Sequence, residues 1–159
     1  MVPTPGQAGP GQAHVEGGRL WAGGAATAVV AALVAFAGVV IIEDVFDLPM
    51  VEPPLLPIGG SLAVRYAVTA AALALLATGI GHLLALTTPR PRSFFHWIVG
   101  LATVIGVVLP FAAEGTLGGQ MATAGLNLVL GLCVLSLVSS VLARTFSAGP
   151  RGPGTAIPR

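Results

Sequence analysis

Four long apolar runs, none containing a charged residue, constrain this chain more than any other feature. An α-helix rises about 1.5 Å per residue, so about 20 apolar residues cross the roughly 30 Å hydrocarbon core of a bilayer. The four runs, all of which reach that length, are Leu20–Ile42, Ala67–Thr88, Phe94–Ala113 and Gly115–Ala143. They predict an integral membrane protein with four spans.

The composition agrees with lipid as the main solvent. Only 8% of the residues are charged and 55% are hydrophobic, whereas about 25% of the residues in soluble domains are charged. The seven cations are all arginines and are spread along the chain, so they form no clustered basic face for nucleic acid. Cys133 is the single cysteine and has no partner for an intramolecular disulfide or a metal site.

The placement of arginine predicts the orientation, because cytoplasmic connections carry an excess of Lys and Arg. If every run crosses, one side holds Arg19, Arg90, Arg92, Arg144, Arg151 and Arg159. The opposite side holds Arg65 together with Glu43, Asp44, Asp47, Glu52 and Glu114. We therefore expect both termini to be cytoplasmic.

The first run has a competing interpretation as a cleaved signal peptide. Arg19, the apolar stretch after it and the triplet Ala35-Phe36-Ala37 resemble a signal sequence with its cleavage site. The apolar run nevertheless continues to Ile42, beyond the roughly 7–15 residues of a signal peptide's apolar region. We therefore expect the first run to be retained as a span.

The remaining residues form tails and connectors. Residues 1–18 and 147–159 are rich in Pro and Gly without apolar periodicity, which predicts disordered cytoplasmic tails. The connector from Glu43 to Arg65 interleaves prolines with apolar residues, which predicts an irregular segment over the outer ends of the helices. The predicted fold is an all-α polytopic membrane domain, residues 19–146. It is an antiparallel bundle of four transmembrane helices with a long irregular outer loop between helices 1 and 2. Its spans are about 20–42, 63–88, 94–113 and 119–144.

Local signals refine these spans. Ser61 and Ser93 are expected to cap the second and third helices. Pro110 lacks an amide proton and crowds the carbonyl of Gly106, so we expect a kink or an opened turn there.

Small residues recur at helical spacing in the first two spans. Lipid tails are as apolar as Leu, so helices associate in membranes through close packing and interhelical hydrogen bonds. The two predicted contact stripes are Gly23, Thr27, Ala31 and Ala35 in the first span, and Ala70, Ala74, Ala77 and Gly81 in the second.

The pattern Trp-x-x-Gly-x-Ala-Thr occurs at Trp21–Thr27 and again at Trp97–Thr103. A parallel duplication of spans 1–2 as spans 3–4 would produce it. Coincidence within Ala- and Gly-rich sequence would produce it too, so both interpretations stay open.

Few polar residues occur within the spans. The four apolar runs contain no Asp, Glu, Lys or Arg, which argues against a proton-driven antiporter, because such proteins need ionisable groups at membrane depth. His82 and His96 lie on the cytoplasmic side of adjacent spans, but no third ligand or helical pair motif accompanies them. Asn127 is interpreted as an interhelical hydrogen-bonding residue. We therefore assign no catalytic, cofactor-binding or metal-binding residue and expect no cofactor.

Three segments carry a resemblance to a known family: Gly18–Gly24, Leu86–Pro91 and Phe95–Thr103. Together they resemble the small bacterial four-helix membrane proteins grouped as domain of unknown function 6069. The resemblance covers roughly Arg19 to Arg144 and implies four spans in a bacterial inner membrane. It implies no activity, cofactor or functional residue.

The leading hypothesis for function is a non-enzymatic accessory or scaffold subunit. Its expected partners are the lipid bilayer and either further copies of itself or another membrane protein, with no nucleic acid. One alternative is a small oligomeric transporter or channel, because four helices rarely enclose a pore alone. The other is a haem- or metal-binding redox protein using His82 and His96.

Overall fold

The computed structural model describes residues 11–52, 60–88 and 91–146. Within these ranges the chain is all-helical, which confirms the predicted class. Two short turns, the π-helical η1 (Ile41–Val45) and the 3₁₀-helical η2 (Leu109–Ala112), extend the first and third long helices. The four long helices are α1 (Gly11–Val40), α2 (Leu62–Thr87), α3 (Pro91–Val108) and α4 (Leu117–Phe146). All four belong to segments long and apolar enough to cross a membrane.

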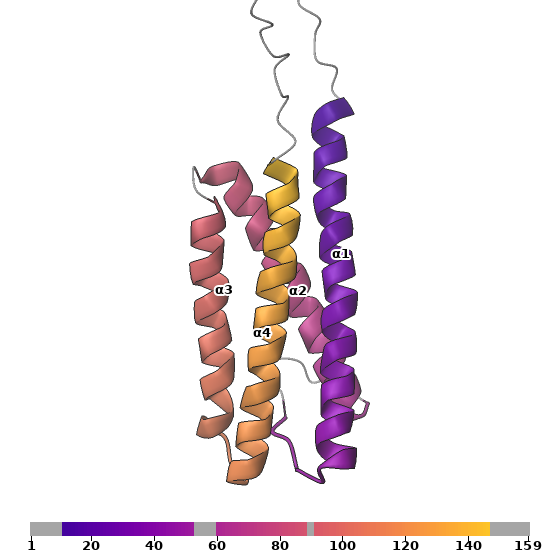
Figure 1. Cartoon of the computed structure of the whole chain (residues 1–159), viewed down its shortest axis with the longest axis vertical. Helices are drawn as coiled ribbons and strands as arrows, with labels where there is room; N and C mark the ends of the chain where they lie inside the picture. The colour runs from indigo at the N-terminus through magenta and orange to yellow at the C-terminus, as the bar shows by residue number, and fades with distance from the viewer. Residues whose placement is uncertain (1–10, 53–59, 89–90, 147–159) are drawn as a thin grey trace, which may run out of the picture.

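The helices lie side by side, and helices that follow one another in the chain run in opposite directions (Figure 1). We call the end where α1 finishes and α2 begins the connector end. From there α2 starts beside α1 and crosses behind α4 to reach the first turn of α3 (Figure 1). As a result α2 has its most extensive contact with α1, and it diverges from α3 toward the connector end.

Small residues, several of them from the predicted stripes, lie where α1 and α2 are in close contact. Ala31 and Ala35 of α1 and Ala74 of α2 are completely buried. Gly24 of α1 lies directly against Thr78 of α2, so that a Cβ at Gly24 would collide with the threonine side chain. The absence of larger side chains along this line lets the two backbones approach closely and supplies the packing that holds helices together in lipid.

Large apolar side chains cover the outside of the molecule. Leu33, Trp97 and Leu101 have 64%, 78% and 63% of their surface exposed, respectively. In the apolar segment Arg92–Ala112, which includes most of α3, only 17% of the most apolar stretch is buried. Soluble monomers rarely expose contiguous apolar patches of such extent, so this surface requires an apolar environment.

Two helix starts differ from the predictions. α1 begins at Gly11, so residues 11–18 are helical and their assignment to a disordered tail is wrong. Once the apolar run has nucleated a helix, each further residue adds a hydrogen bond at little cost. The remainder of that tail, residues 1–10, and the other tail, 147–159, lie outside the described residues. α3 begins at Pro91 and contains Ser93, so Ser93 is not the cap. Proline suits the first turn because its φ is already helical and it has no amide to satisfy.

The cap of α2 is confirmed. Ser61 has an extended backbone, and its Oγ accepts a hydrogen bond from the amide of Val64 at 3.4 Å. This bond satisfies one of the free amides at the start of α2. The first turn of α2 is thereby fixed next to the connector.

Two glycines at equivalent positions of the repeated pattern give a matched test of helix contact. Gly24→Ala should lower the free energy of unfolding by about 1–3 kcal/mol, because the new methyl group meets Thr78. Gly100 has open space around it, so Gly100→Ala should leave stability unchanged or raise it by up to about 1 kcal/mol through helix propensity. Thermal unfolding of the purified variants in detergent measures both. Equal effects of the two substitutions would contradict the packing described.

Candidate functional site

A proline in the turn η2, which follows α3, leaves a backbone carbonyl in need of a hydrogen-bond donor. Regular α-helix stops at Val108 and continues as the 3₁₀ turn η2, which contains Pro110. Because Pro110 has no amide proton, it cannot donate to the carbonyl of Gly106. The side chain of Asn127 on α4 replaces it, with Nδ2 donating to Gly106 O at 2.7 Å. The predicted opened turn and the predicted interhelical role of Asn127 are both confirmed.

A second set of hydrogen bonds fixes the connector over the helix ends. Tyr66 of α2 donates its hydroxyl to the carbonyl of Val51 at 2.6 Å. The amide of Val51 donates to Thr123 Oγ1 of α4 at 3.2 Å. Beside it, the carbonyl of Pro49 lies against Gly119, where a Cβ would not fit. The prediction of an irregular segment over the helix ends is therefore confirmed for residues 46–52, while residues 53–59 lie outside the described ranges.

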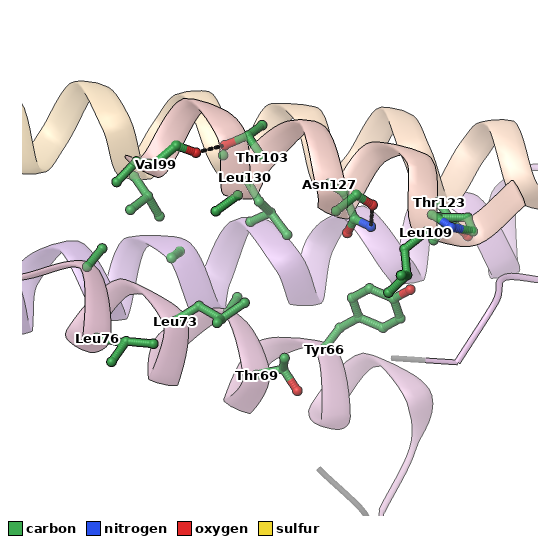
Figure 2. Close-up of a pocket in the computed structure, with 18 of the residues that line it drawn as sticks. Tyr66, Thr69, Leu73, Leu76, Val99, Thr103, Leu109, Thr123, Asn127 and Leu130 are labelled. Carbon is green, nitrogen blue, oxygen red and sulfur yellow. Dashed lines mark hydrogen bonds between the residues drawn. The ribbon is translucent and has the colours of Figure 1, made fainter. Parts of the chain in front are cut away.

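A cavity of about 500 Å³ lies beneath this connector, between α2, α3 and α4, with Ala31 of α1 among its lining residues. Figure 2 shows Leu73 and Leu76 on its α2 side and Val99, Thr103 and Leu130 on its opposite side. The volume is in the range of pockets that bind one small molecule. The cavity exists because α2 diverges from α3 along its course (Figure 1).

The side chains at the edge of the cavity show where it opens. Leu73 and Leu76 of α2 and Ile98 of α3 all line it, and 46%, 59% and 41% of their surfaces, respectively, are exposed. These residues face the molecule's apolar exterior between α2 and α3. The cavity is therefore open sideways, toward the medium that surrounds the helices.

The polar groups of the cavity gather at its connector end. Tyr66, Thr123 and Asn127 line that end, as does Glu52, whose carboxylate pairs with Arg65 Nη1 at 3.0 Å. Farther along, apart from Thr103, whose hydroxyl donates to Val99 O, the lining residues are apolar and include Ala77, Ile80 and Val134. The cavity is thus amphipathic along its length.

Thr69 stands apart from three other threonines of the helices. The hydroxyls of Thr27, Thr78 and Thr103 donate to the carbonyl four residues back, which is the usual arrangement in helices. Thr69 is 7% exposed and borders the cavity, and its buried Oγ1 has no hydrogen-bond partner in the described part of the chain. Such a group costs free energy unless a partner arrives.

His82 and His96 do not line the cavity. His96 Nδ1 lies 2.6 Å from the carbonyl of Arg92, which can only accept, so this nitrogen carries the proton. Its Nε2 lies 3.2 Å from Ser139 Oγ of α4. His82 is half-buried in α2. Among the described residues, no three His, Cys, Asp or Glu side chains are grouped to hold a metal.

Sequence reasoning missed Tyr66 and Thr69 as site residues. Tyr66 resembles an ordinary interface aromatic and Thr69 an ordinary helical threonine. The available signal was their spacing, since residues three apart lie on the same helix face. On α2 that face also carries the small residues Ala70 and Ala77, and all four line the cavity.

Comparison with known families agrees with the resemblance in the sequence. Residues 15–144 match a family described as a family of unknown function, DUF6069. The chain belongs to this family. No curated protein and no solved structure matches it.

The bond between Asn127 and Gly106 can be tested by a double-mutant cycle with Pro110. Asn127→Leu should cost about 0.6 kcal/mol, and at most about 1.7 kcal/mol, because it leaves the Gly106 carbonyl without a donor. Pro110→Ala returns an amide to residue 110, so Asn127→Leu should cost less in that background. Unfolding in detergent of the four proteins measures the coupling. Strictly additive effects would show that Asn127 does not replace the missing donor.

Proposed function

We propose that this chain is a non-enzymatic integral membrane protein with four transmembrane helices that binds an apolar molecule in its lateral cavity. The four apolar helices and the large exposed side chains around them support the membrane location. The resemblance of the sequence to a family of small bacterial four-helix membrane proteins supports the bacterial plasma membrane as the compartment. The cavity is the observation that carries the binding role.

Both termini are proposed to face the cytoplasm. Six arginines belong to the two tails and to the connection between α2 and α3. In the structure, the start of α1 and the end of α4 lie at the same end of the molecule as the end of α2 and the start of α3 (Figure 1). The acidic residues Glu43, Asp44, Asp47, Glu52 and Glu114 belong to the connector end. This asymmetry follows the positive-inside rule, which places the connector end outside.

The chemistry of the cavity supports binding rather than catalysis. Glu52 and Tyr66 are the ionisable groups among its lining residues. Glu52 is engaged in the ion pair with Arg65, and Tyr66 in the hydrogen bond with Val51. General acid–base catalysis needs a positioned group that is free to exchange a proton with the substrate. Neither residue is arranged in that way.

The same geometry bears on the scaffold and transport hypotheses. The small-residue stripes through which a scaffold would bind a partner are partly used inside the molecule, since Ala35 and Ala74 are fully buried and Ala70 and Ala77 line the cavity. Ion-selective pores are lined by rings of backbone carbonyls or charged side chains, whereas the polar lining residues of this cavity, apart from Thr103, lie toward its connector end. An accessory role is retained, with the bound molecule as the ligand that it presents or stores.

Labelling of single cysteines tests the orientation. In a Cys133→Ala background, Asp44→Cys and Ser93→Cys place exposed thiols near opposite ends of the helices. In intact cells a membrane-impermeant maleimide should react with Asp44→Cys alone, and Ser93→Cys should react only after the membrane is opened. The reverse pattern would overturn the orientation, and reaction of both in intact cells would overturn the four-span topology.

Photolabelling tests the cavity with an apolar probe. Hexadecane carrying a diazirine at its midpoint should label residues of the cavity wall, such as Leu73 and Val99, in protein reconstituted into nanodiscs. Ala102 is exposed on the α3 side of the cavity, so Ala102→Phe should fill the space and reduce this labelling several-fold. Peptide mapping by mass spectrometry provides the measurement.

Ala72→Phe is the matched control, since Ala72 is exposed on α2 and does not line the cavity. It introduces the same ring at a lipid-facing position and should leave the labelling of the cavity wall unchanged. Equal labelling of the Ala102→Phe and Ala72→Phe proteins would refute a ligand in the cavity. Crosslinks between two copies of the chain through the cavity would refute it as well.

A further inference from the structure

We infer that the ligand of this cavity is an uncharged, lipid-soluble molecule that donates a hydrogen bond, for example from a hydroxyl group, to the amide oxygen of Asn127. The apolar body of the molecule lies against the apolar lining residues. This inference rests on the proposed function of the cavity and specifies the chemistry of its ligand.

Only one end of the Asn127 amide is in use. Its Nδ2 donates to the carbonyl of Gly106 at 2.7 Å, which fixes the orientation of the amide. Its Oδ1 takes part in no hydrogen bond among the described residues. Because a carboxamide oxygen accepts up to two hydrogen bonds, a complete acceptor is left unused.

This unused oxygen is accessible from the cavity. Within the described part of the chain, the enclosed side-chain atoms without a hydrogen-bond partner are Arg65 Nε and Thr69 Oγ1. Oδ1 of the half-buried Asn127 is not among them, so it retains accessible surface. Asn127 lines the cavity, and Figure 2 shows its side chain pointing from α4 into the space between α4 and α2. Thr69 takes no part in this contact, since Figure 2 shows its hydroxyl directed away from Asn127.

The depth of Asn127 separates it from water. It lies near the middle of the apolar segment Leu117–Val141, about 15 Å from the start of α4 at about 1.5 Å per residue. That distance is about half the thickness of the hydrocarbon core. Lipid tails offer no donor, and an unpaired acceptor is costly in such surroundings. A ligand that brings its own donor removes this cost.

The open side of the cavity determines where the ligand comes from. The exposed Leu73, Leu76 and Ile98 border this opening. The connector covers the end of the cavity through the bonds of Val51 to Tyr66 and Thr123. A ligand therefore enters sideways from the lipid phase and has to be soluble in it.

The charges of the lining residues favour an uncharged donor. Among the described lining residues, Glu52 is the one that is charged at neutral pH, and its carboxylate pairs with Arg65 Nη1 at 3.0 Å. An ammonium group is also a donor, but no unpaired carboxylate in the described lining compensates its charge. Burial of an uncompensated charge costs more than one hydrogen bond returns.

The test compares four probes that share one chain and a midpoint diazirine: hexadecane, hexadecanol, the methyl ether of hexadecanol and hexadecylammonium. The ether accepts hydrogen bonds but cannot donate one, so the ratio of alcohol to ether labelling measures donation alone. Hexadecanol should label the cavity wall about two- to tenfold more strongly than the ether, which is the gain expected from one net hydrogen bond. Hexadecylammonium should label it less strongly than hexadecanol. In reconstituted full-length protein, labelling of the wall is normalised to that of the lipid-facing Leu33.

Variants assign the ratio to one oxygen. In Asn127→Leu the ratio of alcohol to ether labelling should fall to about one, while hexadecane continues to label the wall and so shows that the cavity is intact. Thr103→Val is the matched control, because Thr103 lines the same cavity and its hydroxyl already donates to Val99 O at 2.8 Å. Its ratio should equal that of the unmodified protein.

A second background separates recognition from the stability of the turn. Asn127→Leu also leaves the Gly106 carbonyl without a donor. In Pro110→Ala, residue 110 regains an amide that can serve this carbonyl. Asn127→Leu should lower the ratio in this background as well, and a loss confined to the native background would overturn the inference.

The remaining outcomes distinguish the ligand's chemistry from the proposed function. If hexadecane labels the wall but the alcohol and the ether label it equally, the inference about the donor is wrong, and the cavity remains a binding site. A stronger signal from the ether or the ammonium probe, a ratio that survives Asn127→Leu, or a ratio that is lost in Thr103→Val has the same meaning. If no probe labels the wall, the proposed function itself fails.

Discussion

The close approach of α1 and α2 is the constraint on which the rest of this structure depends. In lipid there is no hydrophobic force between helices, so packing of small residues has to hold them together. Gly24 against Thr78, and the buried Ala31, Ala35 and Ala74, keep α2 against α1. Because α2 also has to meet the start of α3, it crosses the molecule obliquely (Figure 1). The space between α2 and α3 is a geometrical consequence of satisfying both contacts.

The polar groups near this space have structural roles before they have any other. Asn127 donates a hydrogen bond to the carbonyl that Pro110 leaves free. Tyr66 donates to the carbonyl of Val51, and Thr123 accepts from the amide of Val51. In a medium without water every backbone group has to find an internal partner. Those partners bring hydroxyl and amide groups to one end of an otherwise apolar cavity. The cavity is therefore amphipathic because the backbone groups at this end need polar side chains as hydrogen-bond partners.

The sequence was informative where one-dimensional signals are strong. The four apolar runs predict the helices, and Pro110 predicts the opened turn near Gly106. The spacing of small residues predicts which faces of the first two helices pack closely, but not which helix each face meets. The cavity could not be predicted, because it depends on the crossing angle of α2, which no periodicity encodes. Helix starts were predicted less well. α1 begins at Gly11 because a helix, once formed, extends into preceding residues at little cost. α3 begins at Pro91 rather than at the predicted cap Ser93, because proline already has the helical φ of a first turn. The repeated Trp-x-x-Gly pattern has different surroundings in its two copies, because Gly24 is packed and Gly100 is open.

The 3₁₀ turn in η2 also affects how α3 matches a bilayer. The apolar segment Arg92–Ala112 has 21 residues, whereas the other three have 25 or 26. A 3₁₀ helix rises about 2.0 Å per residue rather than about 1.5 Å, so the four residues of η2 lengthen the segment by about 2 Å. Thickness mismatch costs a fraction of a kcal/mol per ångström. The proline that breaks the helix therefore also makes the shortest of the four apolar segments longer, and so closer in length to the thickness of the surrounding hydrocarbon.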